Sequence, residues 1–303
     1  SDGIIPNNEY DRYNFTFRDV TKFLKDKLTV DLSASYILQD NKNMIAAGKY
    51  FNPLPALYLF PRGDDFDNVR LYQRWDESRN LYTQAWDYGS GDMSFQNPYW
   101  IMNKMINQTK KRRYMLSANL KYDVTDWLDV TGRVKVDNAD MDITEKRYAG
   151  TDTNFAGEKG MYSIIKRNDR QIYADAIANI DLTFAGDYHL SANVGASLKD
   201  VRMDFMGWGG DLRKIPNFFS ITNISTTNYK EREDGSHIQS QSIFANVELA
   251  WKSMLYLTVT GRNDWESALA FSKYKSFFYP SVGLSAVVSE MVDMPEWFSF
   301  LKV

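Results

Sequence analysis

The sequence lacks cysteine, has only two histidines and contains no long apolar run. Without cysteine, no disulfide framework, thiolate zinc site or cysteine nucleophile is available. A helical membrane protein is excluded because no run of about 18 or more apolar residues occurs, and the first residues do not resemble a signal peptide. The net charge of −3 gives no global attraction to a polyanion, so we expect no nucleic-acid partner.

Residues with catalytic or metal-binding potential are scarce. His189 and His237 have no nucleophile or carboxylate at a motif spacing, so the sequence predicts neither an enzyme nor a cofactor. Three loop carboxylates, Asp64, Asp65 and Asp67, could offer oxygen ligands to Ca²⁺, but they lack the glycine and glutamate spacing of an EF-hand. They are weak candidates, and no metal site is predicted.

Aromatic residues, by contrast, are abundant. They make up 15% of the chain, with 19 Tyr, 18 Phe and 8 Trp. This content suits either a surface that handles glycans or a belt of side chains at a membrane interface. Composition leaves both possibilities open.

A hairpin pattern repeats along the chain. The segments that begin at Ala118, Ala178 and Ala245 each hold a strand, a break of a few residues and a second strand. Apolar and polar side chains alternate along them with the period of two that a β-strand requires. The sequence predicts ten strands, at residues 9–20, 27–39, 112–124, 128–138, 171–184, 188–200, 240–251, 255–265 and 276–289, and a last one that begins near Phe298.

The predicted connections alternate between short and long. Tight turns join the strands within each hairpin, and long loops join successive hairpins at the opposite end of the strands. His237 and the run GWGG from Gly207 fall in these predicted loops. Aromatic side chains mark the tight turns, namely Phe23, Tyr122, Trp127, Phe184, Tyr188, Trp251 and Tyr256. A bilayer explains such a rim because Trp and Tyr favour the headgroup level.

The alternation also predicts which side of the sheet meets water. The apolar face, which includes Leu120 and Val134, is expected to face lipid, and the charged face is expected to line a water-filled lumen. A soluble sheet that packs its apolar face inward is the alternative. The lumen-facing candidates are Lys121, Arg133, Lys135, Asp175, Asp181 and Arg262. Their mixed signs suit neutral or zwitterionic substrates, because an ion-selective pore shows one dominant sign.

Aromatic residues of the predicted loops are the candidates for substrate binding, since their ring faces could stack on sugar rings or peptide side chains. These residues are Trp75, Trp86, Tyr88, Tyr99, Trp100 and Trp208. The preferred interpretation is that they pack the loops against one another or against a lid partner, because a long ordered loop must bury side chains of its own.

Several runs resemble the SusC/RagA-type TonB-linked outer-membrane transporters of Bacteroides-like bacteria. They are NPYW from Asn97, RYMLSANLKYDVTDWLDVTGRV from Arg113, TVTGRNDWESAL from Thr258, FFYPSVGLSAVVSEMV from Phe277 and WFSFLKV from Trp297. The last runs are the most specific, because their order and spacing are similar to those of the family. The resemblance extends over essentially the whole chain.

The resemblance implies a barrel of about 22 strands, plugged by an N-terminal domain, energised through the TonB complex and covered by a SusD-like surface lipoprotein. Such a transporter takes glycan- or peptide-derived nutrients across the outer membrane of a Gram-negative bacterium. Residues 1–303 would then form an all-β segment of an antiparallel up-and-down transmembrane barrel, with short periplasmic turns, long extracellular loops and a surface in contact with outer-membrane lipid. The signal peptide, TonB box, plug and remaining strands are expected to be absent from this segment.

Two other functions remain open at this stage. One is a soluble β-rich glycan-binding module, which requires the face with Leu120 and Val134 to be buried in a core. The other is a passive porin, which the family-like runs disfavour.

Overall fold

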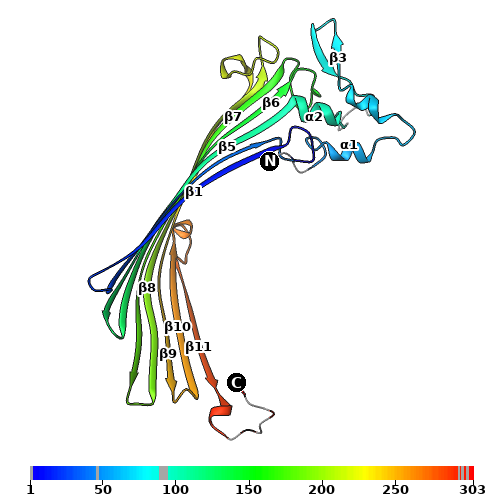
Figure 1. Ribbon diagram of the computed structural model, residues 1–303. Coiled ribbons are helices and arrows are strands. Elements are labelled where there is room, and N and C mark those ends of the chain that lie inside the picture. The colour runs from blue at the N-terminus through cyan, green and yellow to red at the C-terminus, as the bar shows by residue number, and fades with distance from the viewer. Residues whose placement is uncertain (1–2, 46–47, 89–94, 293, 295–296, 298–299) are drawn as a thin grey trace.

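The computed structural model describes residues 3–45, 48–88, 95–292, 294, 297 and 300–303. Most of these residues form one antiparallel sheet of nine strands in up-and-down order (Figure 1). The strands are β1 (Glu9–Phe23), β2 (Leu28–Lys42), β5 (Met105–Thr125), β6 (Leu128–Tyr148), β7 (Gly160–Phe184), β8 (Tyr188–Leu212), β9 (Ile224–Trp251), β10 (Leu255–Glu266) and β11 (Ser276–Ala286). The antiparallel up-and-down architecture predicted from the sequence is confirmed.

The two ends of the sheet differ (Figure 1). At the turn end, each hairpin closes over a few residues, and left-handed residues such as Ala185, Gly186, Lys252 and Ser253 make two of the turns. At the loop end lies a lobe formed by residues 43–45, 48–88 and 95–104, which we call the loop lobe. It contains α1 (Leu54–Tyr58), η1 (Phe66–Arg70), the hairpin of β3 (Gln73–Asp76) and β4 (Leu81–Gln84), and α2 (Pro98–Lys104).

The helices of the described residues are short. Besides α1, α2 and η1 they comprise the 3₁₀ turns η2 (Ile221–Asn223), η3 (Ser267–Leu269) and η4 (Val288–Glu290). None of the helices in this described part is long and apolar enough to span a bilayer.

The edges of the sheet are β1 and β11, and within the described residues the sheet does not close on itself. The predicted tenth strand begins near Phe298, which lies outside the described residues. Its far end is visible, however, because the backbones of Ala286 and Val303 exchange two hydrogen bonds of 2.9 Å. Residues 301–303 therefore continue the antiparallel order beyond β11.

Five strands are far longer than the sequence predicts. The expected strand at 171–184 is β7, which has 25 residues, and the one at 240–251 is β9, which has 28. Consequently the GWGG run from Gly207 lies in β8 and His237 lies in β9, so their placement in loops was wrong. The connections between β6 and β7 and between β8 and β9 are reduced to residues 149–159 and 213–223.

The apolar face of the sheet, which we call the outer face, is not buried in a core. Its side chains stand opposite one another in register, for example Leu116 with Val136 and Tyr122 with Val130. Val134 is 48% exposed, and Leu120 and Leu257 are exposed to a similar degree. A buried hydrophobic cluster of Trp100, Ile101 and Met105 lies instead where the loop lobe meets β5.

Aromatic side chains border the outer face at two levels. At the turn end they are Phe23, Tyr122, Phe184, Tyr188 and Trp251, and towards the loop end they are Tyr36, Tyr114, Trp265 and Phe278. Tyr256 is the exception to the predicted rim, because it pairs with Ala250 and Ser285 on the opposite face. From Leu255 to Trp265 the strand rises about 33 Å, or roughly 25 Å in height at a tilt of about 40°, which matches a hydrocarbon layer.

Beyond this apolar band the outer face becomes charged while the strands continue. The change occurs at Asn138 on β6, Arg170 on β7 and Asp200 on β8. Ion pairs and hydrogen bonds then join neighbouring strands, including Arg112 to Asp142 at 3.1 Å and His237 to Asp200 at 2.8 Å. A common level at which apolar residues end is expected where strands leave the bilayer and enter water.

A lysine within the apolar band should lower the free energy of unfolding much more than a lysine in the part of the outer face beyond that band. We expect Val134→Lys to lower the free energy of unfolding in lipid vesicles by about 2–4 kcal/mol if it lies near the midplane. Met206→Lys is the matched control, because Met206 is equally exposed on the same face but lies beyond the band. Equal stability of the two variants, measured by urea titration of the full-length receptor, would contradict the assigned sidedness.

Candidate functional site

The charged face of the sheet, which we call the inner face, carries all six residues predicted to line a lumen. The register places Arg133 directly opposite Asp175, Lys135 opposite Tyr173, and Lys121 opposite Thr131. Asp181 and Arg262 lie on the same face of β7 and β10. The period-two alternation of each strand therefore gathers these side chains on one surface.

Arginine–aspartate pairs join neighbouring strands across the inner face. Arg133 on β6 donates to Asp175 on β7 through Nε at 2.9 Å and through Nη2 at 2.8 Å. The Asp175 side chain has no exposed surface, whereas that of Arg133 is 39% exposed. Two similar two-point pairs join Arg113 to Asp137 and Arg18 to Asp31. Such paired, planar contacts are directional, so they stabilise the strand register as well as the charges.

Three of the other predicted charges, Lys121, Asp181 and Arg262, are also close to partners. Lys121 lies 3.2 Å from Asp123 and 3.8 Å from Asp129. Asp181 lies 3.6 Å from a ring nitrogen of His189. The guanidinium of Arg262 on β10 donates to Asp264 on the same strand at 2.7 Å and to Ser242 on β9 at 2.9 Å. Most of this wall therefore neutralises its own charge.

The NPYW run anchors the loop lobe. Asn97 caps the N-terminus of α2, because its side-chain oxygen accepts the backbone N–H of Tyr99 at 2.8 Å. Its amide also donates to the carbonyls of Val69 and Ala85. Trp100 has no exposed surface, and its indole donates to the hydroxyl of Thr151 at 3.0 Å. The run therefore ties α2 to the rest of the lobe and to the β6–β7 connection.

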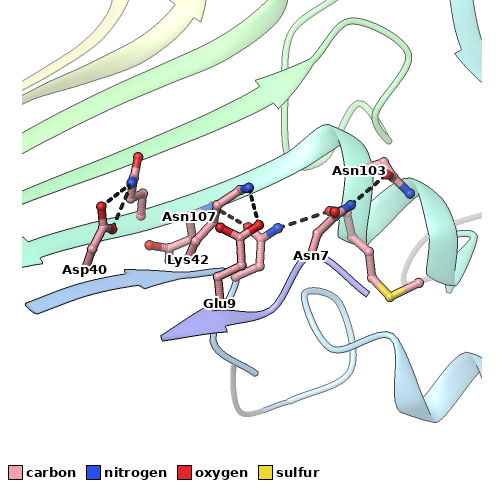
Figure 2. Close-up of polar contacts among 9 residues, drawn as sticks. Asn7, Glu9, Asp40, Lys42, Asn103 and Asn107 are labelled. Atoms are coloured by element: carbon pink, nitrogen blue, oxygen red, sulfur yellow. Dashed lines mark hydrogen bonds and ion pairs between the residues drawn. The ribbon is translucent and has the colours of Figure 1, made fainter. Parts of the chain in front are cut away.

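Polar contacts fasten the lobe to the rim of the sheet. Figure 2 shows contacts that join the start of β1, the end of β2, and the start of β5 with the adjacent end of α2. They are Asn7 to Asn103 at 2.8 Å, Lys42 to Glu9 at 2.8 Å, Gln108 to Asp40 at 2.8 Å, and the backbone N–H of Asn107 to the side chain of Asn43 at 3.0 Å. The lobe is thus held at a fixed position above the loop end.

The predicted binding aromatics fall into different environments. Trp75 is 49% exposed and packs edge-on against Tyr82 at the β3–β4 hairpin. Trp86 and Tyr88 are half-buried and contact each other at 5.1 Å. Trp100 is completely buried, so it cannot stack on a substrate as it stands, and Tyr99 beside it is half-buried. The structure keeps only Trp75 widely open to solvent among these five.

Trp208 was placed in a loop by the sequence, but it lies within β8 on the outer face. The error has a physical cause. The strands beyond the apolar band carry both polar and apolar side chains on each face, so the alternation that reveals a strand is absent there. For the same reason the sequence missed a hollow on the inner face near the loop end, which is lined by Arg147, Phe205, Lys230 and Arg232.

Two loop groups have shifted pKa values. The hydroxyl of Ser78 donates to Asp76 and lowers the pKa of that carboxyl, although partial desolvation opposes the shift. Burial raises the pKa of the Tyr88 hydroxyl, and the neighbouring Asp64 carboxylate raises it further. The pKa of Asp76 moves down and that of Tyr88 moves up, so neither group is brought to titrate near neutral pH.

The three weak metal candidates are not brought together. Asp65 accepts the backbone N–H of Asp67 at 2.9 Å, and Asp67 lies 3.5 Å from Arg70. Within the described ranges, no group of three or more His, Asp or Glu side chains is placed to hold a metal ion. These carboxylates instead shape the turn that begins η1.

Breaking the buried pair on the inner face should destabilise the wall. We expect Arg133→Met to lower the free energy of unfolding by about 2 kcal/mol or more, because the buried carboxylate of Asp175 loses its counter-charge. Arg18→Met is the control, and it should cost less than about 1 kcal/mol because the Arg18 pair is open to solvent. Denaturant titration of the receptor in vesicles measures both, and losses of equal size would argue against the assigned role of Asp175.

Trp100 and Trp75 should separate packing from recognition. Trp100→Ala removes a fully buried ring, so we expect the lobe to lose about 3 kcal/mol or more of local stability. Trp75→Ala should leave the lobe unchanged, because that ring is half exposed. Hydrogen exchange of residues 95–104 and 148–151 reports on both variants. Unchanged protection in Trp100→Ala would show that the lobe does not depend on the NPYW run.

Comparisons with known proteins address the fold. No family model matches the chain. The TonB-dependent receptor P26 of Formosa agariphila is 22% identical over the whole chain, which spans 29% of that receptor. Among solved structures, the RagAB peptide transporter matches 97% of the chain and 32% of its own, with a TM-score of 0.73 and 13% identity. The siderophore receptor PiuA from Acinetobacter baumannii matches 94% of the chain and 40% of its own, with a TM-score of 0.50 and 15% identity.

These relatives extend far beyond the segment, because the chain spans less than a third of the receptor P26 and of the RagAB chain. All are named as receptors or transporters. The resemblance to SusC/RagA-type transporters is thereby confirmed at the level of fold. The chain has the fold of a barrel segment of TonB-dependent outer-membrane receptors.

Proposed function

We propose that this chain is part of the barrel wall of a TonB-dependent nutrient importer in the outer membrane of a Gram-negative, Bacteroides-like bacterium. The observation that carries the proposal is the two-sided sheet: one face has an apolar band bordered by aromatic side chains, and the other has paired charges. A sheet of this kind needs lipid on one side and water on the other. The RagAB and PiuA folds support the same assignment.

The likeness to larger receptors supports a barrel of about 22 strands, of which residues 1–303 contribute one segment. The remaining strands, a plug and the contact with the TonB complex would then belong to the rest of that receptor. In this orientation the turn end faces the periplasm and the loop lobe faces the exterior. The chain performs no chemistry of its own, and it requires no cofactor.

The transported molecule is proposed to be an oligosaccharide or a peptide. A wall whose arginines and aspartates neutralise one another repels neither sign, which suits a bulky nutrient rather than a small ion. The structural neighbour RagAB is described as a peptide transporter, whereas the open ring of Trp75 suits either a sugar or a peptide. Of the aromatic candidates, Trp75 is retained for such contacts, and Trp100 is not.

A SusD-like surface lipoprotein is the proposed partner at the loop end. The lobe exposes several large apolar side chains there, including Tyr58, Leu59, Leu71, Trp75 and Tyr82. Exposed apolar groups gathered on one lobe are typical of an interaction surface. The polar contacts of the rim would hold this surface in a constant position for the lid.

The two alternatives are less well supported. A soluble glycan-binding module requires a buried outer face, but Leu116, Leu120, Val134 and Leu257 are exposed. A passive porin shares the sheet, and only the requirement for energy distinguishes it from an importer.

Uptake by the full-length receptor should therefore depend on the TonB complex. We expect import of its nutrient to stop when TonB is deleted or when the proton gradient is collapsed, because a plugged barrel opens only when work is done on it. Growth on the nutrient and uptake of a labelled nutrient are the measurements, and a strain that lacks the receptor is the control. Uptake that persists without TonB would identify a passive pore.

A further inference from the structure

A hollow of about 660 Å³ lies on the inner face near the loop end. The inner faces of β7, β8 and β9 form its floor, and residues 153–156 of the β6–β7 connection lie beside it. Gly207 and Gly209 leave part of the floor without side chains. A Cβ at these positions would lie 3.1 Å from Ile165 Cγ1 and 2.8 Å from Ser163 Oγ, so the strands approach closely there and the hollow stays open.

The side chains around this hollow carry an excess of positive charge. Arg147, Lys230 and Arg232 line it, against the single carboxylate of Asp211, which accepts the backbone N–H of Gly157 at 2.8 Å. Elsewhere on the inner face, arginines form short two-point pairs with aspartates, as Arg133 does. The lining of the hollow therefore holds more cations than carboxylates.

The cations are positioned by other contacts. The guanidinium of Arg232 lies over the ring of Phe205 at 4.6 Å, and only a loose pair of 3.6 Å joins it to Asp234. The guanidinium of Arg147 lies over the ring of Phe51 at 4.6 Å, but its Nη atoms already donate to the carbonyl of Phe155 at 2.8 Å and to Glu145 at 3.1 Å, so Arg147 contributes positive charge rather than free donors. Within the described residues, no carboxylate forms an ion pair with Lys230. Stacking on a ring fixes a guanidinium while leaving its N–H donors able to bind an anion.

The floor favours recognition through side chains. Each of β7 and β8 pairs with a strand on both sides, so its backbone N–H and C=O groups are already hydrogen-bonded. An extended peptide is usually held by main-chain hydrogen bonds to a free strand edge. From Ile224 to Gln239, β9 pairs with β8 alone, and the edge that it leaves free lies on the side away from β7 and β8. An oligosaccharide can be held by cationic side chains that bind its acidic groups.

We propose that this hollow binds an acidic oligosaccharide, one that carries carboxylate or sulfate groups, at the outer mouth of the lumen. The proposal rests on the proposed transport function and names its substrate class. Lys230 and Arg232 bind the anionic groups directly, and Phe205 positions Arg232. Beyond the hollow, arginines such as Arg113 and Arg133 are already paired with aspartates, so they hold an anionic ligand less tightly and allow it to move on.

The test measures binding to the purified full-length receptor by calorimetry. The probes are a size-selected oligogalacturonate, its methyl ester, a sulfated oligosaccharide and oligoglutamate. The test variant is Lys230→Gln with Arg232→Gln. The matched control is Lys166→Gln, because Lys166 lies on the outer face of β7. Resistance of the folded barrel to unfolding on gels without boiling shows that each variant is folded.

We expect an acidic oligosaccharide to bind, the methyl ester to bind much more weakly, and salt to weaken the binding. The double variant should lose on the order of tenfold in affinity, whereas Lys166→Gln should bind as the unchanged receptor does. Equal binding by the double variant, equal binding of the methyl ester, or no binding of either acidic oligosaccharide would overturn the proposal. Tighter binding of oligoglutamate, lost in the double variant, would replace the glycan with an acidic peptide. Because binding needs no energy source, these results are independent of whether uptake requires TonB.

Discussion

A strand that crosses hydrocarbon has no water to satisfy its backbone, so every N–H and C=O must pair with a neighbouring strand. The continuous registers from β2 to β10 meet this requirement over the whole apolar band. The same constraint explains the unusual distribution of apolar side chains. Since the ladder holds the sheet together, Val134 and Leu257 can remain on the surface, where lipid replaces the core that a soluble sheet would need.

The inner face solves the complementary problem, which is to keep ionised groups beside water without giving the wall a strong charge. Arg133 with Asp175, and Arg113 with Asp137, join adjacent strands and cancel their charges locally. The hollow near Arg232 departs from this pattern, because that guanidinium rests on the ring of Phe205 and has only a loose pair with Asp234. A wall that is neutral along most of its length and positive at its mouth can select a ligand at entry and release it further in.

The loop lobe behaves as a small folded unit attached to the rim. Its buried cluster around Trp100 gives it a core, the cap of Asn97 fixes the start of α2, and the contacts of Figure 2 join it to three strands. A connection of this length would otherwise carry a large entropic cost of ordering. The order of the lobe allows its exposed side chains, such as Trp75, to present a defined surface.

The sequence alone determined the order of the strands, the tight turns and the identity of the inner-face residues. Inside the bilayer a strand must alternate apolar and polar side chains, and the residues from Ala118 to Val136 show that alternation. It did not reveal that β9 continues from Gln239 back to Ile224, or that Trp208 lies in a strand. Water touches both faces beyond the apolar band, so no alternation is required there. Only the tertiary structure made those segments strands, because their backbones pair with neighbouring strands that are already fixed in the membrane. It alone also brought Arg147 and Arg232 to the same hollow.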